Sequence, residues 1–205
     1  MSILQMSKCQ VSGIAFHRAR NSSKPFIYSL ERGVKKLPEH IVELLIVNDS
    51  EVFAPRRVVE LFPKLKYESP EKWIEGSTWE NARGCRMDTK IVVAEEYLSR
   101  KTGFYVKTKN IHGVLRHETG HRLYDITIDN NEGLEEIFEQ KVKRDLDNFT
   151  QEEKDYFDYY LRSNEAFSEV TAALLGGGCE EGKSIDFLLE KFTNVRKFVG
   201  EMLNI

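Results

Sequence analysis

The residues with the clearest chemical potential are His117-Glu118-Thr119-Gly120-His121, an H-E-x-x-H pattern. Apolar residues recur around it at spacings of three and four, so we expect both histidines on one face of a helix. Side chains four residues apart on a helix have Cβ atoms about 6 Å apart, which lets two imidazole nitrogens meet at one zinc ion. Glu118 is suited to take a proton from a water molecule at that ion. The alternative is a pair of ordinary surface or core histidines.

A zinc site of this kind needs one more protein ligand, because catalytic zinc commonly takes three protein ligands and a water molecule. Glu165 and Glu169 are the best candidates, since they lie four residues apart on a helical face that is otherwise apolar. Burying a carboxylate is costly unless it is paired. One of them is expected to bind the ion and the other to accept the N–H of a ligand histidine, and the spacing alone does not assign these roles. The alternative is that both face solvent.

The remaining histidines and the cysteines have no supporting pattern. His17, His40 and His112 are isolated, so we expect ordinary core or surface roles for them. The cysteines are an odd number without C-x-x-C spacing, which indicates free thiols in a reducing compartment. They are Cys9, Cys85 and Cys179.

The chain has 205 residues, a formal net charge of −3 and 40% hydrophobic residues, which is typical of one soluble globular domain. Nucleic-acid binding is not expected, because such proteins concentrate Lys and Arg against phosphates. No membrane span is expected either, since Glu43 interrupts the best apolar stretch at 41–47. The N-terminal residues do not form a signal peptide pattern, which favours the cytoplasm, with non-standard secretion or delivery into another cell as the alternative.

The elements that must position the candidate residues are mostly helical in the second half of the chain. The helices expected there cover 114–126, 133–146, a segment capped by Thr150 and Glu153, 164–175, and a long last segment capped by Ser184. Ser163 or Asn164 is expected to cap the fourth helix, and Gly176, Gly177 and Gly178 to end it. The last segment carries an apolar stripe, which indicates packing against the core.

The first half of the chain mixes short helices with strands. Pro38 is expected at the first position of a helix over EHIVELLIV. Runs of β-branched and aromatic residues indicate strands over 52–54, 90–94 and 104–107. A short helix is expected over 55–62, and a helical turn in the sequence EEYLSR that separates the last two strands.

Taken together, these motifs resemble a known family. The H-E-x-x-H pattern is followed by Glu165 in E-A-F-S-E, 44 residues after His121. This is similar to the zinc peptidases related to the catalytic domain of anthrax lethal factor and to the pro-pro endopeptidases, whose second motif is E-F-F-A-E. The segment Thr78-Trp79-Glu80-Asn81, the strand over 90–94 and the Phe-rich last helix resemble that family too, so the likeness covers roughly 70–203 with a weaker match over 38–62.

This resemblance implies roles for individual residues. His117, His121 and Glu165 would bind one Zn²⁺ per chain, with Glu118 as general base. Glu169 would accept a hydrogen bond from a ligand histidine. The family also has a tyrosine seven positions before the ligand glutamate, where this chain has Asp158. Tyr156, Tyr159 and Tyr160 lie within two residues of that position, and Tyr160 is the preferred candidate for stabilising the oxyanion.

The resemblance also implies a fold and a reaction. The fold class would be α+β, a two-lobed zincin-like domain with a small mixed sheet, an active-site helix and a mostly helical C-terminal lobe. A single domain would then cover 1–205, with an N-terminal α/β lobe over 1–113 and a helical lobe over 114–205. The reaction would be hydrolysis of peptide bonds by a metal-activated water, in peptide or protein substrates bound extended along a sheet edge. The strand over 90–94 is the candidate for that edge.

Two features bear on specificity and on alternatives. Residues 132–158 contain ten acidic and four basic residues, which would favour basic peptides if this segment borders the cleft. The alternative for this segment is a solvated helical face. Because Asp158 replaces the expected tyrosine, a second hypothesis is a catalytically inactive zinc-binding regulatory or interaction domain of the same fold. A third is a helical interaction protein in which H-E-x-x-H is coincidental.

Overall fold

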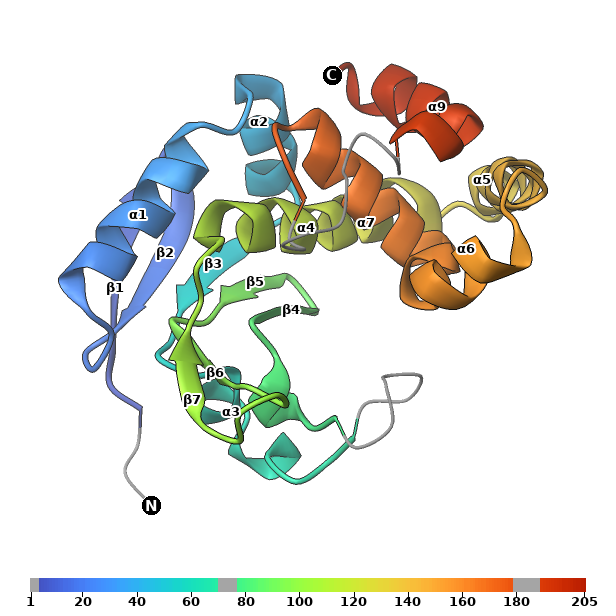
Figure 1. The fold of residues 1–205 in the computed structure, drawn as a ribbon. Coiled ribbons are helices and arrows are strands. Elements are labelled where there is room, and N and C mark those ends of the chain that lie inside the picture. Colours follow the sequence, from blue (N-terminus) through green and yellow to red (C-terminus); the bar gives the residue numbers. More distant parts are fainter. Residues whose placement is uncertain (1–3, 70–76, 179–188) are drawn as a thin grey trace.

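A computed structural model describes residues 4–69, 77–178 and 189–205 and shows an α+β architecture with a small mixed sheet (Figure 1). The strands of this sheet lie in the order β1 (Met6–Val11), β2 (Ile14–Ala19), β3 (Glu51–Ala54), β5 (Lys90–Val93) and β4 (Gly84–Met87). The strand pairs β1–β2 and β4–β5 are antiparallel, whereas β2–β3 and β3–β5 are parallel. Phe16, Val52 and Ile91 lie side by side across the three central strands.

The sheet order corrects one expectation. The strand over 90–94 is β5, and it pairs with β3 on one side and with β4 on the other. Both of its edges are therefore occupied, and it is not available to an extended peptide. Among the described strands, the outermost one on this side of the sheet is β4.

The two faces of the sheet bury different cores because successive strand side chains point to opposite sides. Ile91 and Val93 of β5 belong to the main core, which also includes residues of α4 (Ile111–Tyr124). Val92, between them, packs with Cys85 and Ala94 in a smaller cluster on the other face. A strand that is buried on both faces carries apolar residues on both, and Ile91, Val92 and Val93 of β5 follow this rule.

Helix α4 lies at the centre of the molecule, between the sheet and the other helices of the C-terminal half (Figure 1). It packs on β4 and β5 of the sheet, beside α1 (Lys24–Lys35), and α7 (Ser163–Leu174) packs against it. The further helices are α2 (Glu39–Val47), α3 (Val58–Leu61), α5 (Glu132–Leu146), α6 (Gln151–Phe157) and α9 (Thr193–Leu203). Of these, α5 packs on α9, and α9 packs on α7.

The helix predicted over 114–126 is confirmed, with an earlier start. It begins at Ile111, because the side chain of Asn110 accepts a hydrogen bond from the backbone N–H of Gly113 at 3.0 Å. It ends at Tyr124 and continues as a π-helical turn, η3 (Asp125–Asp129). The helix predicted over 133–146 is α5, and Thr150 and Glu153 form the predicted capping box of α6.

The helix predicted over 164–175 is confirmed, but its cap is different. Helix α7 starts at Ser163, so neither Ser163 nor Asn164 caps it, and Arg162 occupies the cap position without a side-chain hydrogen bond. This start places Glu165 in the first turn, where the helix dipole favours a negative charge. Gly176 and Gly177 have φ angles of 107° and 130°, which end the helix as predicted.

In the first half, the predicted elements after residue 37 are confirmed with one exception. Helix α2 is present, but Pro38 is its N-cap and not its first residue as predicted, because the backbone of Pro38 is not helical. The strands over 52–54, 90–94 and 104–107 are β3, β5 and β7 (Tyr105–Lys107), and the short helix within 55–62 is α3. The helical turn in EEYLSR is wrong: Glu96–Leu98 form β6, which pairs antiparallel with β7, with Glu96 opposite Lys107. An extended backbone is required because β6 and β7 pair along their length.

The N-terminal elements were not predicted. Strands β1 and β2 form a hairpin around Ser12 and Gly13, whose φ angles of 51° and 85° suit a tight turn. Helix α1 follows Ser23, whose side chain accepts a hydrogen bond from the backbone N–H of Phe26, and has Pro25 in its first turn. These turn and cap residues are the sequence features that indicate the hairpin and the start of α1.

The single long helix predicted at the end of the chain is interrupted, because α9 starts at Thr193 and Phe192 before it has a non-helical backbone. Ser184, the predicted cap, lies outside the described residues. Helix α9 buries Val195 and Val199 of the predicted apolar stripe, together with Leu203. The fully buried carboxylate of Asp145, at the end of α5, accepts hydrogen bonds from the backbone N–H groups of Asn194 and Val195 and so caps α9.

Among the helices in the described part of the chain, none has the length and apolar content that crossing a membrane requires.

Candidate metal centre

The structure brings three buried side chains to one point between α4 and α7. The Nε2 atoms of His117 and His121 lie 3.1 Å apart on the inner face of α4. Oε2 of Glu165, from the first turn of α7, lies 3.2 Å from the first and 3.3 Å from the second. Among the described residues, this is the one group whose ligand atoms converge as a metal site requires.

The dimensions of this triangle fit a tetrahedral metal ion. Zinc binds histidine nitrogen and carboxylate oxygen at about 2.0–2.1 Å, and two ligands of a tetrahedron at that distance are about 3.3–3.4 Å apart. The three observed separations of 3.1–3.3 Å are close to this value. The donor set of two imidazoles and one carboxylate is one that catalytic zinc uses, with a fourth position left for water.

The buried atom Oε2 of Glu165 accepts no hydrogen bond from any described residue, although both Nε2 atoms lie near it. Burial by itself would raise the pKa of the Glu165 carboxyl, but the adjacent His121 and His117 imidazoles hold this pKa well below its usual range. The carboxylate is therefore ionised. A buried, ionised oxygen that accepts no hydrogen bond is suited to bind a cation.

Glu169 lies one helical turn beyond Glu165 and has a different partner. Its Oε2 is 2.8 Å from Nδ1 of His117. Because an ionised carboxylate only accepts hydrogen bonds, Nδ1 of His117 carries the proton and its Nε2 presents a lone pair toward the triangle. The geometry therefore separates the two glutamates, whose roles the spacing left open: Glu165 faces both imidazoles, and Glu169 orients one of them.

Glu118 lies beside the triangle and faces a cavity. The cavity measures about 170 Å³, and its lining includes Glu118, His121, Glu165, Trp79 and Arg86. Burial raises the pKa of the Glu118 carboxyl, and the neighbouring His117 and His121 imidazoles offset part of this rise. A carboxyl group with a raised pKa beside a cavity that can hold water is suited to exchange protons near neutral pH.

The edge strand β4 forms one wall of this cavity. A Cβ atom on Gly84 would lie 2.7 Å from Val114 Cγ1 and 3.0 Å from Glu118 Cγ, so only glycine lets the strand approach the helix this closely. Cys85, the next residue, also lines the cavity, but burial raises the pKa of its thiol well above the usual value. Cys85 is therefore a neutral thiol and not a nucleophile.

The position of α7 depends on Gly120 within the H-E-x-x-H pattern. A Cβ atom at this position would lie 2.6 Å from Cα of Ser168 on α7. The two helix backbones are thus in direct contact at this point, which brings Glu165 within reach of the histidines.

Gly120→Ala is expected to force α4 and α7 apart. We expect a decrease in the free energy of unfolding of about 1–3 kcal/mol, the usual cost of overpacking, together with loss of zinc binding because Glu165 moves away. Urea unfolding and metal analysis check these effects. The matched control is Gly133→Ala in α5, where the new Cβ has no neighbour closer than 3.7 Å and helix propensity should add up to about 1 kcal/mol. Equal stability of the two variants would contradict the close approach.

The tyrosine expected near the site is not located by the structure. Asp158 is exposed in the 3-10 turn η4 (Asp158–Leu161). The side chains of Tyr156, Tyr159 and Tyr160 lie outside the described part of the structure, so the role of Tyr160 stays a prediction.

The other expected features lie away from the triangle. Nε2 of His17 contacts Glu51, Nε2 of His40 contacts the carbonyl of Leu203, and Nε2 of His112 contacts the carbonyl of Ser29. None of the described residues that line the cavity belongs to the acidic segment 132–158, so that segment does not provide its charge. The charged residue that sequence reasoning missed is Arg86. No motif marks it, because its proximity to the site depends on the pairing of β4.

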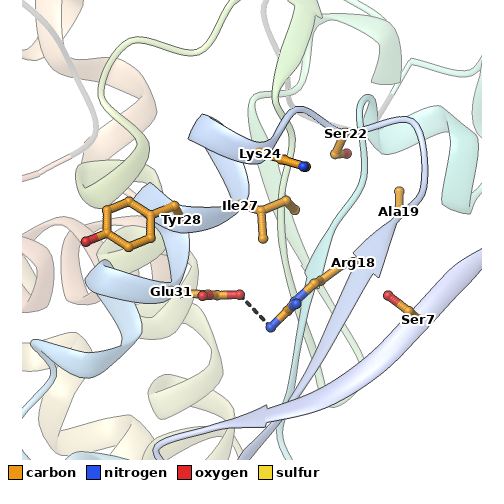
Figure 2. Close-up of a pocket in the computed structure, with 8 residues that line it drawn as sticks. All are labelled: Ser7, Arg18, Ala19, Ser22, Lys24, Ile27, Tyr28 and Glu31. Atoms are coloured by element: carbon orange, nitrogen blue, oxygen red, sulfur yellow. Dashed lines mark ion pairs between the residues drawn. The ribbon is translucent and has the colours of Figure 1, made fainter.

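A second, larger cavity of about 320 Å³ lies beside β2 and α1 (Figure 2). Arg18 of β2 points across it toward Glu31 of α1, and the two form an ion pair at 2.7 Å. Ser7 and Lys24 also line it, but no histidine does. Its lining therefore lacks the ligands and the proton acceptor that the first cavity has.

Comparison with known proteins gives a likeness in fold. No family model matches the chain, and no curated protein matches it by sequence. Among solved structures, a pro-pro endopeptidase from Paenibacillus alvei superposes with a TM-score of 0.58 at 16% sequence identity, covering 91% of this chain and 96% of that one. This likeness concerns the fold.

Proposed function

We propose that this protein is a zinc-dependent endopeptidase. The observation that carries the proposal is the triangle of His117 Nε2, His121 Nε2 and Glu165 Oε2, with the buried carboxyl of Glu118 beside it. The fold, which is similar to that of a pro-pro endopeptidase, supports a peptide substrate. The α+β chain would then be a single two-lobed, zincin-like domain, with lobes over 1–113 and 114–205.

In this proposal each residue has a separate task. A zinc ion held by His117, His121 and Glu165 would polarise the scissile carbonyl and lower the pKa of a water molecule toward about 7. Glu118 would take a proton from that water and later deliver it to the leaving amine. Glu169 keeps the proton of His117 on Nδ1 and thereby keeps its Nε2 available to the metal. Tyr160 would stabilise the oxyanion.

The substrate would bind along β4. Among the described strands, β4 is one of the two outer strands of the sheet, and Gly84, Cys85 and Arg86 on it line the cavity that contains Glu118. An extended peptide added to an edge strand is recognised through its backbone, which would fix its direction.

The direct test is digestion of a diverse peptide library by the protein purified without added metal, with and without a chelator, read by mass spectrometry. We expect specific internal cuts that the chelator abolishes and zinc restores, together with one zinc per chain. Stoichiometric zinc without any cut would instead favour the inactive zinc-binding domain. Absence of zinc would favour the helical interaction protein.

Glu169→Ala is expected to weaken zinc binding by about 10- to 100-fold, because His117 loses the acceptor that fixes its tautomer and orientation. Competition with a chromogenic chelator measures this affinity. Glu169→Gln is the matched variant, since its amide oxygen still accepts from Nδ1, and it should lose less. If both variants bind zinc as tightly as the parent, the proposed orienting role is wrong.

A further inference from the structure

The charge of the cavity differs from what the sequence suggested. Apart from the metal ligands and Glu118, two ionisable side chains belong to the described lining of the cavity. They are the guanidinium of Arg86 and the thiol of Cys85, which is neutral. Arg86 lies two residues after Gly84 on β4, so its side chain is on the strand face that meets α4. It is 34% exposed and therefore accessible from the cleft.

Among the described residues, Arg86 makes one ion pair, and its buried Nε donates no hydrogen bond. Its Nε lies 3.1 Å from Oδ2 of Asp125, which follows α4 directly and is four residues after His121. The two terminal nitrogens of Arg86 donate no hydrogen bond to any described residue. A guanidinium has five N–H donors in a planar fork that matches a carboxylate, and here the outer part of that fork remains available.

The carboxylate that pairs with Arg86 is shared with a second guanidinium. Nη1 of Arg122 lies 3.9 Å from the same oxygen of Asp125. Arg122 also donates hydrogen bonds to Ser50 and to the carbonyl of Asn48. Of the two arginines, Arg86 is the one that lines the cavity.

We propose that Arg86 selects peptides that carry a carboxylate beside the scissile bond. This inference rests on the proposed peptidase function and names its substrate class. The carboxylate is that of an Asp or Glu side chain, because a free C-terminus beside the scissile bond would belong to the substrate of a carboxypeptidase and not of an endopeptidase. It would accept hydrogen bonds from the terminal nitrogens of Arg86, whose Nε pairs with Asp125.

The test measures binding, so that it does not depend on turnover. Zinc-loaded Glu118→Gln protein is titrated with fluorescent eight-residue peptides in which Glu, Gln or Lys occupies each position in turn, with a free or an amidated C-terminus. At one position of the peptide, we expect the version with Glu to bind about ten- to a hundredfold more tightly than the version with Gln. If the amidated peptides instead lose that factor at every sequence, Arg86 binds the free C-terminus of a carboxypeptidase substrate, and the proposal is overturned.

The variants separate recognition from a structural role. In Arg86→Gln the peptide with Gln and the peptide with Glu should have about equal dissociation constants. In Arg86→Glu the protein should instead prefer the peptide with Lys. Arg83→Gln is the matched control, because Arg83 lies on the same segment but not in the cavity lining, and it should keep the preference for the peptide with Glu. If Arg86→Gln weakens acidic and neutral peptides equally, Arg86 binds a backbone carbonyl or only supports β4, and the proposal is overturned. Absence of binding by every peptide overturns it as well, whereas binding without cleavage by the parent protein contradicts only the peptidase function.

Discussion

Glu118→Gln is expected to lower the rate of peptide cleavage by about 10²- to 10⁴-fold while the protein keeps one zinc ion per chain. The amide has the shape of the carboxyl group but no longer accepts a proton. Because Glu118 belongs to neither the imidazole pair nor the third ligand position, its replacement leaves the triangle intact. Cleavage of a peptide identified in the library, measured as kcat/KM, and metal analysis of the same sample give both quantities.

The fold should tolerate this substitution well. Burial raises the pKa of Glu118, which means that its charged form is disfavoured where it lies, so a neutral amide does not add a desolvation cost. We therefore expect an unfolding temperature equal to or slightly above that of the parent. Glu136→Gln in α5 is the matched control, since this glutamate is exposed and outside the cavity lining. A Glu118→Gln protein that cleaves as fast as the parent would falsify the general-base role.

His121→Ala is expected to abolish zinc binding and, with it, all chelator-sensitive cleavage. Only two of the three ligands remain in this variant, and two protein ligands bind zinc too weakly to retain it at physiological zinc concentrations. In the proposed zinc protein, a zinc concentration of 100 to 1,000 times the dissociation constant would add about 3–4 kcal/mol to the free energy of unfolding. His121→Ala should lose this gain, so its unfolding temperature should not respond to added zinc.

His112→Ala is the matched control for this prediction. His112 is on the same helix, and its Nε2 contacts the carbonyl of Ser29 on α1 and not the triangle. Its removal should reduce stability through lost packing and one lost hydrogen bond but leave the zinc content at one per chain. The metal site proposed here is wrong if both variants retain zinc, or if both lose it while remaining folded.

The sequence was sufficient for the elements whose determinants are local. The helix around His117 and His121, the helix that carries Glu165, the capping box at Thr150 and the terminating Gly176 and Gly177 all follow from spacing and from cap residues, and all are present. Errors occurred where the pairing of strands decides, even between strands that follow each other in the chain. Residues 96–98 are a strand because β7 pairs with them, and β5 is interior because β4 folds back over its edge.

The sequence by itself determined which residue types could form a metal site and that two histidines share a helical face. Which carboxylate meets both imidazoles was decided by the tertiary structure, because that depends on how α7 lies across α4 at the contact between Gly120 and Ser168. The structure alone also placed Arg86 in the cavity and made β4 the edge. Helical periodicity is a property of neighbouring residues, whereas strand order and the contact between two helix backbones are set by packing between segments that the sequence separates.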